Sequence, residues 1–249
     1  MTTAAAVGRS LRMYLAAERR PALDAFHRRF VPAHGLAFDV GCHVGDRAAS
    51  FLRLGARVVA VEPQPRLARA LRFMFRRTTG FTLVEAVVGA EPGEAVLRLN
   101  TRNPTVATAS EAFIGAAACA PGWEGQEWDA ALHVPRTTLD ALVAAHGAPD
   151  FIKIDVEGFE AEALAGLTTA PPALSFEFTT IQRGVAQAAL DRLAALGFRH
   201  FNACLGESME WAFPAAVDAA AMGEWLAALP VEANSGDVYA ALAAEPLRA

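Results

Sequence analysis

The sequence predicts an α/β fold in which a mostly parallel sheet carries helices on both of its faces. Short apolar runs, typical of buried strands, alternate with segments of helical spacing along most of the chain. The clearest unit spans residues 36–62, where an apolar run, a glycine turn, a helix and a second apolar run follow one another. The β-structure expected late in the chain, at residues 198–203 and 237–242, allows the last part of the sheet to run antiparallel.

Glycines and acids at the ends of the first two predicted strands indicate a nucleotide site. The strand at 36–40 leads into the pattern D-x-G-x-x-x-G, formed by Asp39, Gly41 and Gly45, and the strand at 57–61 is followed by Glu62. Glycines let the backbone approach a ligand where a Cβ would clash. An acid about twenty residues further along can bind both hydroxyls of a ribose.

The glycine spacing also indicates which nucleotide binds. A dinucleotide-binding turn has the pattern G-x-G-x-x-G, whereas His43 and Asp46 occupy its second and third glycine places here. Without the third glycine there is no cradle for a pyrophosphate, so a ligand with one ribose and no phosphate fits better. S-adenosylmethionine is the common cofactor of that kind. A nicotinamide-dependent oxidoreductase is the alternative enzyme, which the spacing disfavours, and a non-catalytic cofactor-binding protein is the other alternative.

Composition sets the broad class of protein. With 249 residues, 53% apolar and 20% charged, the chain is expected to form one ordered domain, residues 1–249. The formal net charge of −5 argues against a nucleic-acid partner, which usually requires a basic face. The three widely spaced cysteines form no metal or disulfide framework, which favours a reducing cytoplasm. No apolar run suits a signal peptide or a membrane span, so no membrane partner is expected.

The remaining elements follow in order from spacing and turn residues. Residues 1–33 are predicted as a helical extension, with amphipathic stretches in 8–30 and Pro21 in a first helical turn. This extension is a candidate cover for the pocket. Further helices are predicted at residues 46–54, from Pro65 towards Gly80, and at 137–146, 159–167 and 186–196. Further strands are predicted at residues 150–156 and 173–178.

Two departures from simple alternation are predicted in the middle of the chain. The third strand spans residues 81–88 and brings Glu85 near the expected adenine, and a turn before residues 95–99 predicts a returning strand and hence a hairpin. Residues 101–136 have helical spacing only at 110–118 and are otherwise loop-like. Connections of this length are uncommon and often functional. We interpret this segment as a lid over the acceptor, a plain surface excursion being the alternative.

Three stretches resemble the FkbM family of S-adenosylmethionine-dependent methyltransferases. They are DVGCHVG at residues 39–45, the pair Glu62-Pro63 and FIKIDVEGFE at residues 151–160. The resemblance implies a class I methyltransferase (Rossmann-like) fold with a seven-stranded sheet, and usually methylation of a hydroxyl on a natural product, a sugar or another small molecule. His43 stands where the family commonly has Asn. Together with the glycine turn, the resemblance makes the following residues candidates for cofactor binding: Asp39, Gly41, His43, Gly45, Glu62, Pro63, Glu85 and Asp155.

Two carboxylates are the catalytic candidates. Methyl transfer to a hydroxyl needs alignment of the reactants and a base or a metal ion for the acceptor's proton. Asp155 ends its strand at the same sheet edge as Gly41, and Glu157 follows at the turn. They could act as base and hydrogen-bond acceptor, or jointly hold Mg²⁺. A metal-free site is the favoured expectation, because two carboxylates make a sparse ion site, although Glu177 is a third carboxylate that can reach the pocket.

Four neighbouring residues are assigned lesser roles. His43 has an ordinary pKa suited to a base, but its place beside the donor favours binding. Lys153 alternates to the same face as Asp155, so an ion pair between them is one of two open interpretations. Glu160 and Glu162 are expected to be early-helix acids favoured by the helix dipole, with no further role.

Overall fold

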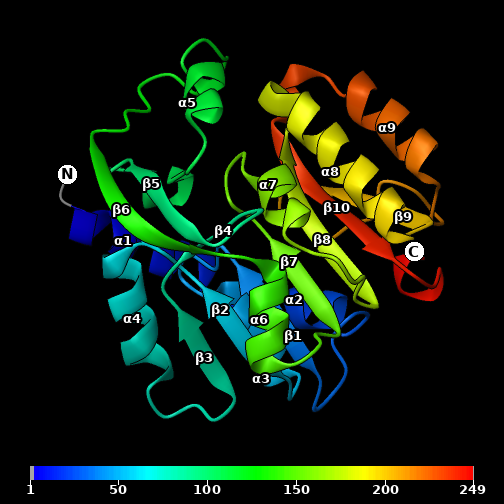
Figure 1. The fold of residues 1–249 in the computed structure, drawn as a ribbon, viewed down its shortest axis with the longest axis horizontal. Helices are drawn as coiled ribbons and strands as arrows, with labels where there is room; N and C mark the ends of the chain where they lie inside the picture. Colours follow the sequence, from blue (N-terminus) through cyan, green and yellow to red (C-terminus); the bar gives the residue numbers. More distant parts are fainter. Residues whose placement is uncertain (1–2, 249) are drawn as a thin grey trace.

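The computed structural model describes residues 3–248, and its central element is a seven-stranded sheet (Figure 1). The strand order is β3-β2-β1-β7-β8-β10-β9, in which the first five strands pair parallel and β10 runs antiparallel to both neighbours. This arrangement confirms the predicted α/β class with a late antiparallel strand. The strands are β1 (Leu36–Val40), β2 (Arg57–Val61), β3 (Phe81–Val84), β7 (Phe151–Ile154), β8 (Ala173–Thr179), β9 (His200–Leu205) and β10 (Ser235–Ala241).

Helices cover both faces of this sheet, as the sequence predicts (Figure 1). One face carries α6 (Leu139–His146), α7 (Glu160–Ala165), α8 (Arg183–Leu196) and α9 (Ala219–Ala228). The other carries α2 (Arg20–His27), α3 (Asp46–Arg53) and α4 (Pro65–Phe75). Short 3₁₀ segments are η1 (Ala17–Arg19), η2 (Pro104–Val106), η3 (Thr180–Gln182), η4 (Val231–Ala233) and η5 (Glu245–Leu247).

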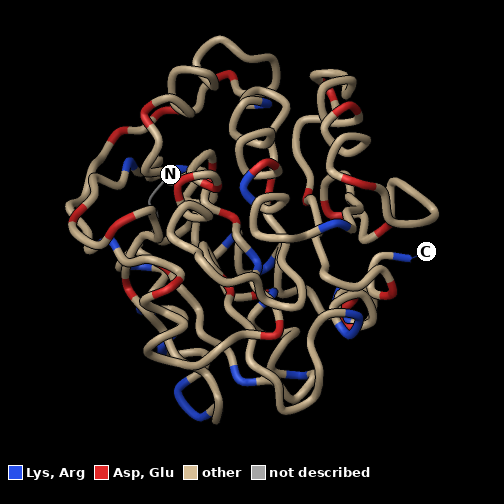
Figure 2. Tube along the Cα trace, turned by 45° about the vertical axis from the view of Figure 1, so that its right-hand side comes forward, with Lys and Arg blue, Asp and Glu red and all other residues tan. Residues whose placement is uncertain are grey.

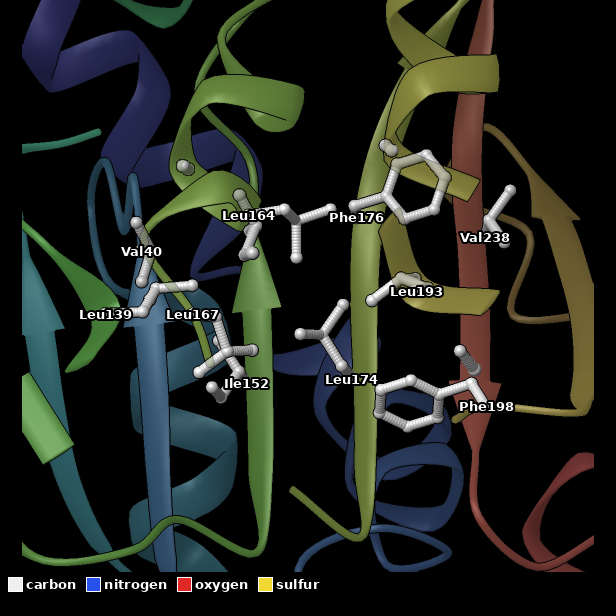
Figure 3. Packing of buried hydrophobic residues seen from close by; sticks show 14 of the residues in the cluster. Val40, Leu139, Ile152, Leu164, Leu167, Leu174, Phe176, Leu193, Phe198 and Val238 are labelled. Carbon is white, nitrogen blue, oxygen red and sulfur yellow. The ribbon is translucent and has the colours of Figure 1, made fainter. Parts of the chain in front are cut away.

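Alternation along the strands divides the core into two layers. Val40, Ile152 and Leu174 lie in the layer beneath α6, α7 and α8 (Figure 3). Phe151 and Tyr239 belong to the opposite layer, beneath α2 and α3. Since successive strand side chains point to opposite faces, the central strands are buried on both sides. A binding site can therefore form only beyond the strand ends, at the carboxyl edge of the sheet.

The predicted third strand is divided between two sheets. Its first half, β3, stays in the main sheet, and its second half joins a separate sheet of order β4-β6-β5. There β5 pairs antiparallel with β6, with Leu97 opposite Leu132. The predicted hairpin between residues 81–88 and 95–99 is therefore wrong, because the partner of β5 lies more than thirty residues later. The strands are β4 (Val87–Val88), β5 (Gly93–Leu99) and β6 (Ala130–Thr137).

A small core of its own holds the second sheet together. Val87, Leu97 and Val134, one from each strand, are buried against one another. Burial of these three side chains stabilises β4 in the second sheet, where it lies after the chain leaves β3. β6 occupies sequence expected to be loop, whereas the helical stretch predicted at 110–118 is present as α5 (Glu111–Ala117).

The N-terminal extension consists of helices, as predicted. α1 (Thr3–Tyr14) packs against α4 and η2, and its Val7 forms a buried cluster with Val44 and with Leu67 of α4. Pro21 lies in the first turn of α2. Acidic and basic residues are interspersed along the trace in the view of Figure 2. Within residues 3–248 no helix is both long and apolar enough to span a membrane, and all three cysteines are free.

Candidate active site

A cavity opens at the carboxyl ends of β1, β2, β7 and β8 and brings most of the predicted site residues together. The second sheet adds Val87 and Leu97 to its wall, and residues 105–109 add small side chains. Tyr14 reaches it from α1, so the N-terminal extension takes part in the cavity. Gly45 and Glu85 are not among the lining residues. The predicted residues that line it are Asp39, Gly41, His43, Glu62, Pro63, Asp155 and Glu157.

Gly41 is required by a close approach of two strands. Its φ of +79° is in the left-handed region, and a Cβ at this position would lie 1.7 Å from the carbonyl oxygen of Asp155. The turn after β1 and the end of β7 are therefore held together through a position that only glycine fits. Gly45, with φ of +77°, begins α3, and a Cβ there would meet Leu71 of α4 at 2.8 Å. Its role is to let α4 pack beside the turn.

Replacing Gly41 with Ala should destabilise the fold strongly. The left-handed conformation alone costs a non-glycine residue about 1–2 kcal/mol, and the clash with the Asp155 carbonyl adds to it. Gly115→Ala is the matched control, because a Cβ there meets nothing within 4 Å and the residue lies inside α5, where alanine is favoured. Urea unfolding that showed equal stability for the two variants would contradict this explanation.

Asp39 anchors the glycine turn to the following helix. The carboxylate is 2% exposed, and its Oδ2 accepts a hydrogen bond of 2.8 Å from the backbone N–H of Ala48 in α3. Burial, followed by the charge of Asp46, raises the pKa of Asp39 to about 7. The residue fixes the direction in which α3 leaves the turn, and this direction shapes the cavity wall.

Glu62 presents to the cavity a carboxylate that backbone hydrogen bonds hold in a fixed orientation. It is 2% exposed; Oε2 accepts from the backbone N–H of His43 at 3.0 Å, and Oε1 accepts from that of Gln64 at 2.8 Å. Burial raises the pKa of Glu62 to about 8, although these two hydrogen bonds act in the opposite direction. Each oxygen keeps acceptor capacity for a further donor, which is the arrangement that a pair of ribose hydroxyls requires.

His43 has a ring nitrogen without a partner at the cavity wall. Its φ is +50°, its ring contacts Tyr14 edge-on at 5.5 Å between centroids, and Nε2 is buried with no hydrogen-bond partner. Burial lowers the pKa of His43, so the imidazole is neutral. The carboxylate or amino group of a bound amino acid is a suitable partner for this nitrogen.

Glu85 is engaged outside the cavity. Its carboxylate forms an ion pair with Arg72 of α4, and the next residue, Ala86, lines the cavity in its place. The predicted contact between Glu85 and an adenine stays a prediction. At this point the chain passes from β3 of the main sheet to β4 of the second sheet.

A buried lysine organises the charges at the end of β7. Nζ of Lys153, 3% exposed, donates to Asp237 of β10 and lies 3.4 Å from Oδ2 of Asp155. The ion pair that the sequence left open is therefore present, with Asp237 as a second partner. Burial works to raise the pKa of Asp155, but Lys153 and Arg47 outweigh it and keep that pKa below its ordinary value. Asp155, whose side chain is 35% exposed, faces the cavity as an ionised group.

The turn that carries Glu157 is held from two directions. Oε1 of Glu160 accepts from the backbone N–H groups of Val156 at 3.0 Å and Gly158 at 3.2 Å, so Glu160 has a structural role that the sequence analysis did not foresee. Thr108, in the segment predicted as a lid, donates from Oγ1 to the carbonyl of Glu157 at 2.7 Å. These bonds hold Glu157 at a φ of +54°, a conformation uncommon outside glycine.

Three carboxylates converge beside this turn. One oxygen each of Asp155, Glu157 and Glu177 lies within 4.8 Å of the others, and all three residues line the cavity. Burial, then the charge of Asp155, raises the pKa of Glu157 and of Glu177 well above the ordinary value. Burial beside the charge of Asp155 therefore favours the protonated form of Glu157 and Glu177, while Asp155 itself keeps its charge.

Sequence reasoning missed three residues of the cavity wall. Arg47 of α3, 7% exposed, pairs with Asp46 and donates to both carboxylate oxygens of Glu207 at 2.8 Å. Glu207 follows β9, 160 residues later, so no local pattern connects the two. Tyr14 belongs to none of the motifs found in the sequence. The one signal available was an arginine in the first turn of the helix predicted at 46–54, and it is weak.

Comparison with known proteins adds the family. Residues 39–199, which are 161 of the 249, match the family model described as the methyltransferase FkbM domain. A search of curated proteins finds no match. Similar solved structures include a precorrin-6y C5,15-methyltransferase from Geobacter metallireducens GS-15, with 13% identity, 90% of this chain and 87% of that chain covered and a TM-score of 0.43.

Two further solved structures are similar at the same level. Fibrillarin from Aeropyrum pernix, in complex with natively bound S-adenosyl-L-methionine, has 11% identity, 85% and 68% coverage and a TM-score of 0.43. A TehB-like methyltransferase from Corynebacterium glutamicum has 10% identity, 88% and 86% coverage and a TM-score of 0.44. The family model, which covers well over half of the chain, decides the assignment. The chain belongs to the FkbM family of S-adenosylmethionine-dependent methyltransferases.

Proposed function

We propose that this methyltransferase methylates a hydroxyl oxygen of a small molecule bound in the cavity. The observation that carries the proposal is the convergence of Asp155, Glu157 and Glu177 at the cavity wall, beside the glycine turn of the cofactor half. A hydroxyl acceptor must lose a proton during transfer, and a carboxylate at the cavity wall is a suitable group to receive it. The nicotinamide-dependent and non-catalytic alternatives are set aside, since the family is that of S-adenosylmethionine-dependent methyltransferases.

The cofactor would be held by the first half of the sheet. Glu62 would accept hydrogen bonds from the ribose hydroxyls, and the unpartnered Nε2 of His43 would meet the amino-acid end. Asp39, Gly41, Gly45 and Pro63 would act through the shape of the turn. When bound, S-adenosylmethionine supplies a methyl group on a positively charged sulfur, which is already activated for displacement.

The chain's own contribution is alignment and proton transfer. Asp155, kept ionised by Lys153, accepts a hydrogen bond from the acceptor and orients it. In the ionised form of Glu157, its carboxylate would take the hydroxyl proton as the methyl group passes to the acceptor oxygen, with the bonding electron pair of the S–CH₃ bond remaining on sulfur. Alignment of reactants in this way can supply roughly 7–11 kcal/mol of the reduction in barrier.

The segment 101–136 is proposed as the cover of the acceptor side. Thr105, Ala107 and Ala109 line the cavity, and Thr108 bonds to the carbonyl of the catalytic turn. The segment thus contacts the cavity and the proposed base together. Its small side chains leave room for a substrate, while its contact with Glu157 connects substrate entry with the geometry of the base.

Product analysis with labelled cofactor tests the acceptor atom. The protein is incubated with S-adenosylmethionine carrying a ¹³C-methyl group and a metabolite extract of the host, and products are examined by mass spectrometry and carbon NMR. We expect a new signal at the chemical shift of a methoxy carbon. A signal only at the position of an N-methyl or S-methyl carbon would contradict O-methylation and leave the methyltransferase assignment in place.

A further inference from the structure

The carboxylates of the cavity outnumber the cations available to them. Lys153 is shared between Asp237 and Asp155, and Arg47 is paired with Asp46 and Glu207. No other Lys or Arg in residues 3–248 lines the cavity. Glu157 and Glu177 therefore lie beside an ionised Asp155 without a cation of their own.

Glu157 is the more unusual of the two, because the residue is largely buried and its carboxylate is joined to no other described side chain or backbone group. Its residue is 8% exposed, yet its carboxylate makes no hydrogen bond or ion pair with any residue from 3 to 248. Glu160, three residues later and 3% exposed, shows the usual outcome: its carboxylate accepts two backbone N–H groups. Oε2 of Glu177 is also buried without a partner. Buried carboxylates are ordinarily paired, protonated or bound to a metal ion.

The geometry of the cluster suits a small hard cation. One oxygen from each of the three residues lies within 4.8 Å of the others, and Mg²⁺ and Ca²⁺ bind oxygens at about 2.0–2.6 Å, so small side-chain movements would bring all three into contact with a single ion. The set contains only oxygen ligands, which favours Mg²⁺, Mn²⁺ or Ca²⁺ over zinc, copper or iron. Because the cluster lines the cavity, the remaining coordination positions face the acceptor side.

We propose that Asp155, Glu157 and Glu177 form a binding site for a divalent cation of the Mg²⁺ type. Its use in catalysis rests on the proposed function: an ion here would bind the acceptor hydroxyl and lower its pKa before transfer. Each carboxylate has two oxygens, so Glu157 can bind the ion through one and accept the proton through the other. The sequence analysis favoured a metal-free site although it named Glu177 as a third carboxylate; the fold brings Glu177 of β8 to within reach of the other two.

Mn²⁺ binding tests the site without any acceptor. Protein stripped with a chelator is titrated with Mn²⁺, and free Mn²⁺ is followed by electron paramagnetic resonance. We expect one saturable Mn²⁺ per chain that Mg²⁺ displaces. Glu157→Gln and Glu177→Gln should each weaken binding by about tenfold or more, since even changes around metal ligands cost about 10–100-fold. Glu162→Gln, at an exposed position of α7, removes the same charge nearby and should bind as the wild type does.

The outcomes separate this inference from the proposed function. Absence of saturable Mn²⁺ binding, or equal binding by Glu157→Gln and Glu177→Gln in variants whose circular dichroism shows a folded chain, would overturn the cation site; protons would then neutralise the cluster. Methyl ether formation that persists in chelator, with S-adenosylhomocysteine still bound, would overturn the ion's catalytic use and leave O-methylation in place. Mn²⁺ binding at the cluster without methyl ether formation would support the site and overturn the acceptor assignment.

Discussion

Replacing Glu157 with Gln is expected to lower methyl transfer by about 10²–10⁴-fold and to raise the stability of the ligand-free protein. The loss of rate follows from removal of the proposed base and ion ligand. The gain in stability follows because Gln cannot ionise, so the repulsion between Glu157 and the two neighbouring carboxylates is removed. Each kcal/mol recovered should raise the melting temperature by about 2–4 °C in a protein of this size.

The effect on stability should depend on pH in a definite direction. The pKa of Glu157 is raised in the folded state, so the native protein holds a proton that the unfolded chain releases. Stability therefore falls as the pH rises above the pKa that Glu157 has in the unfolded chain. The advantage of Glu157→Gln should therefore be larger at pH 8 than near pH 5. Calorimetry in chelator measures it, with Glu162→Gln as the control. A variant both slower and less stable would mean that Glu157 supports the fold and not the reaction.

Replacing Glu62 with Ala is expected to weaken binding of S-adenosylhomocysteine by about 10–100-fold. The variant loses charge-assisted hydrogen bonds to the ribose, worth roughly 1.5–3 kcal/mol. Isothermal calorimetry measures the affinity, and Glu91→Ala, at an exposed turn, is the control. Unchanged affinity in a folded Glu62→Ala variant would remove Glu62 from the cofactor site.

The wild type offers an independent check of the same residue. The pKa of Glu62 is raised to about 8, so the carboxylate is protonated in much of the free protein at pH 6.5 and ionised at pH 9. An ionised carboxylate is the better acceptor for ribose hydroxyls. Affinity for S-adenosylhomocysteine should therefore increase as pH rises through about 8, and this increase should be reduced in Glu62→Ala.

Local patterns were sufficient for the part of the fold that carries the cofactor. The strands at 36–40 and 57–61 have the bounds that their apolar runs predict, and α3 ends one residue before the predicted end, ahead of Gly55. Each of these elements is short, strongly apolar on its buried side and bounded by glycine or proline. The turn residues and the pattern of buried residues therefore favour the same secondary structure in this segment, and no contact with the rest of the chain changes it.

Long-range pairing explains what the sequence could not show. β6 alternates Leu132 and Val134 with polar residues, but Pro135 argues against a strand, and its pairing with β5 depends on residues more than thirty positions away. The charge partners of the site are as distant: Asp237 reaches Lys153 from 84 residues away. Most of the predicted residues do line the cavity, whereas their distant partners could not be predicted, because contacts of that kind leave no periodic signal.

The position of β10 has a consequence for the order in which the chain can fold during synthesis. Because β10 lies between β8 and β9, the facing edges of those two strands have no neighbour until residues 235–241 have left the ribosome. Until then β9 has no place in the sheet, and the buried ammonium of Lys153 lacks Asp237. A nascent chain can complete the strands β1, β2 and β3 that would hold the cofactor early. The buried Lys153 gains its counter-ion Asp237 only when β10 is inserted between β8 and β9. Unpaired strand edges are exposed to other chains during that interval, so it is the period of greatest risk of aggregation.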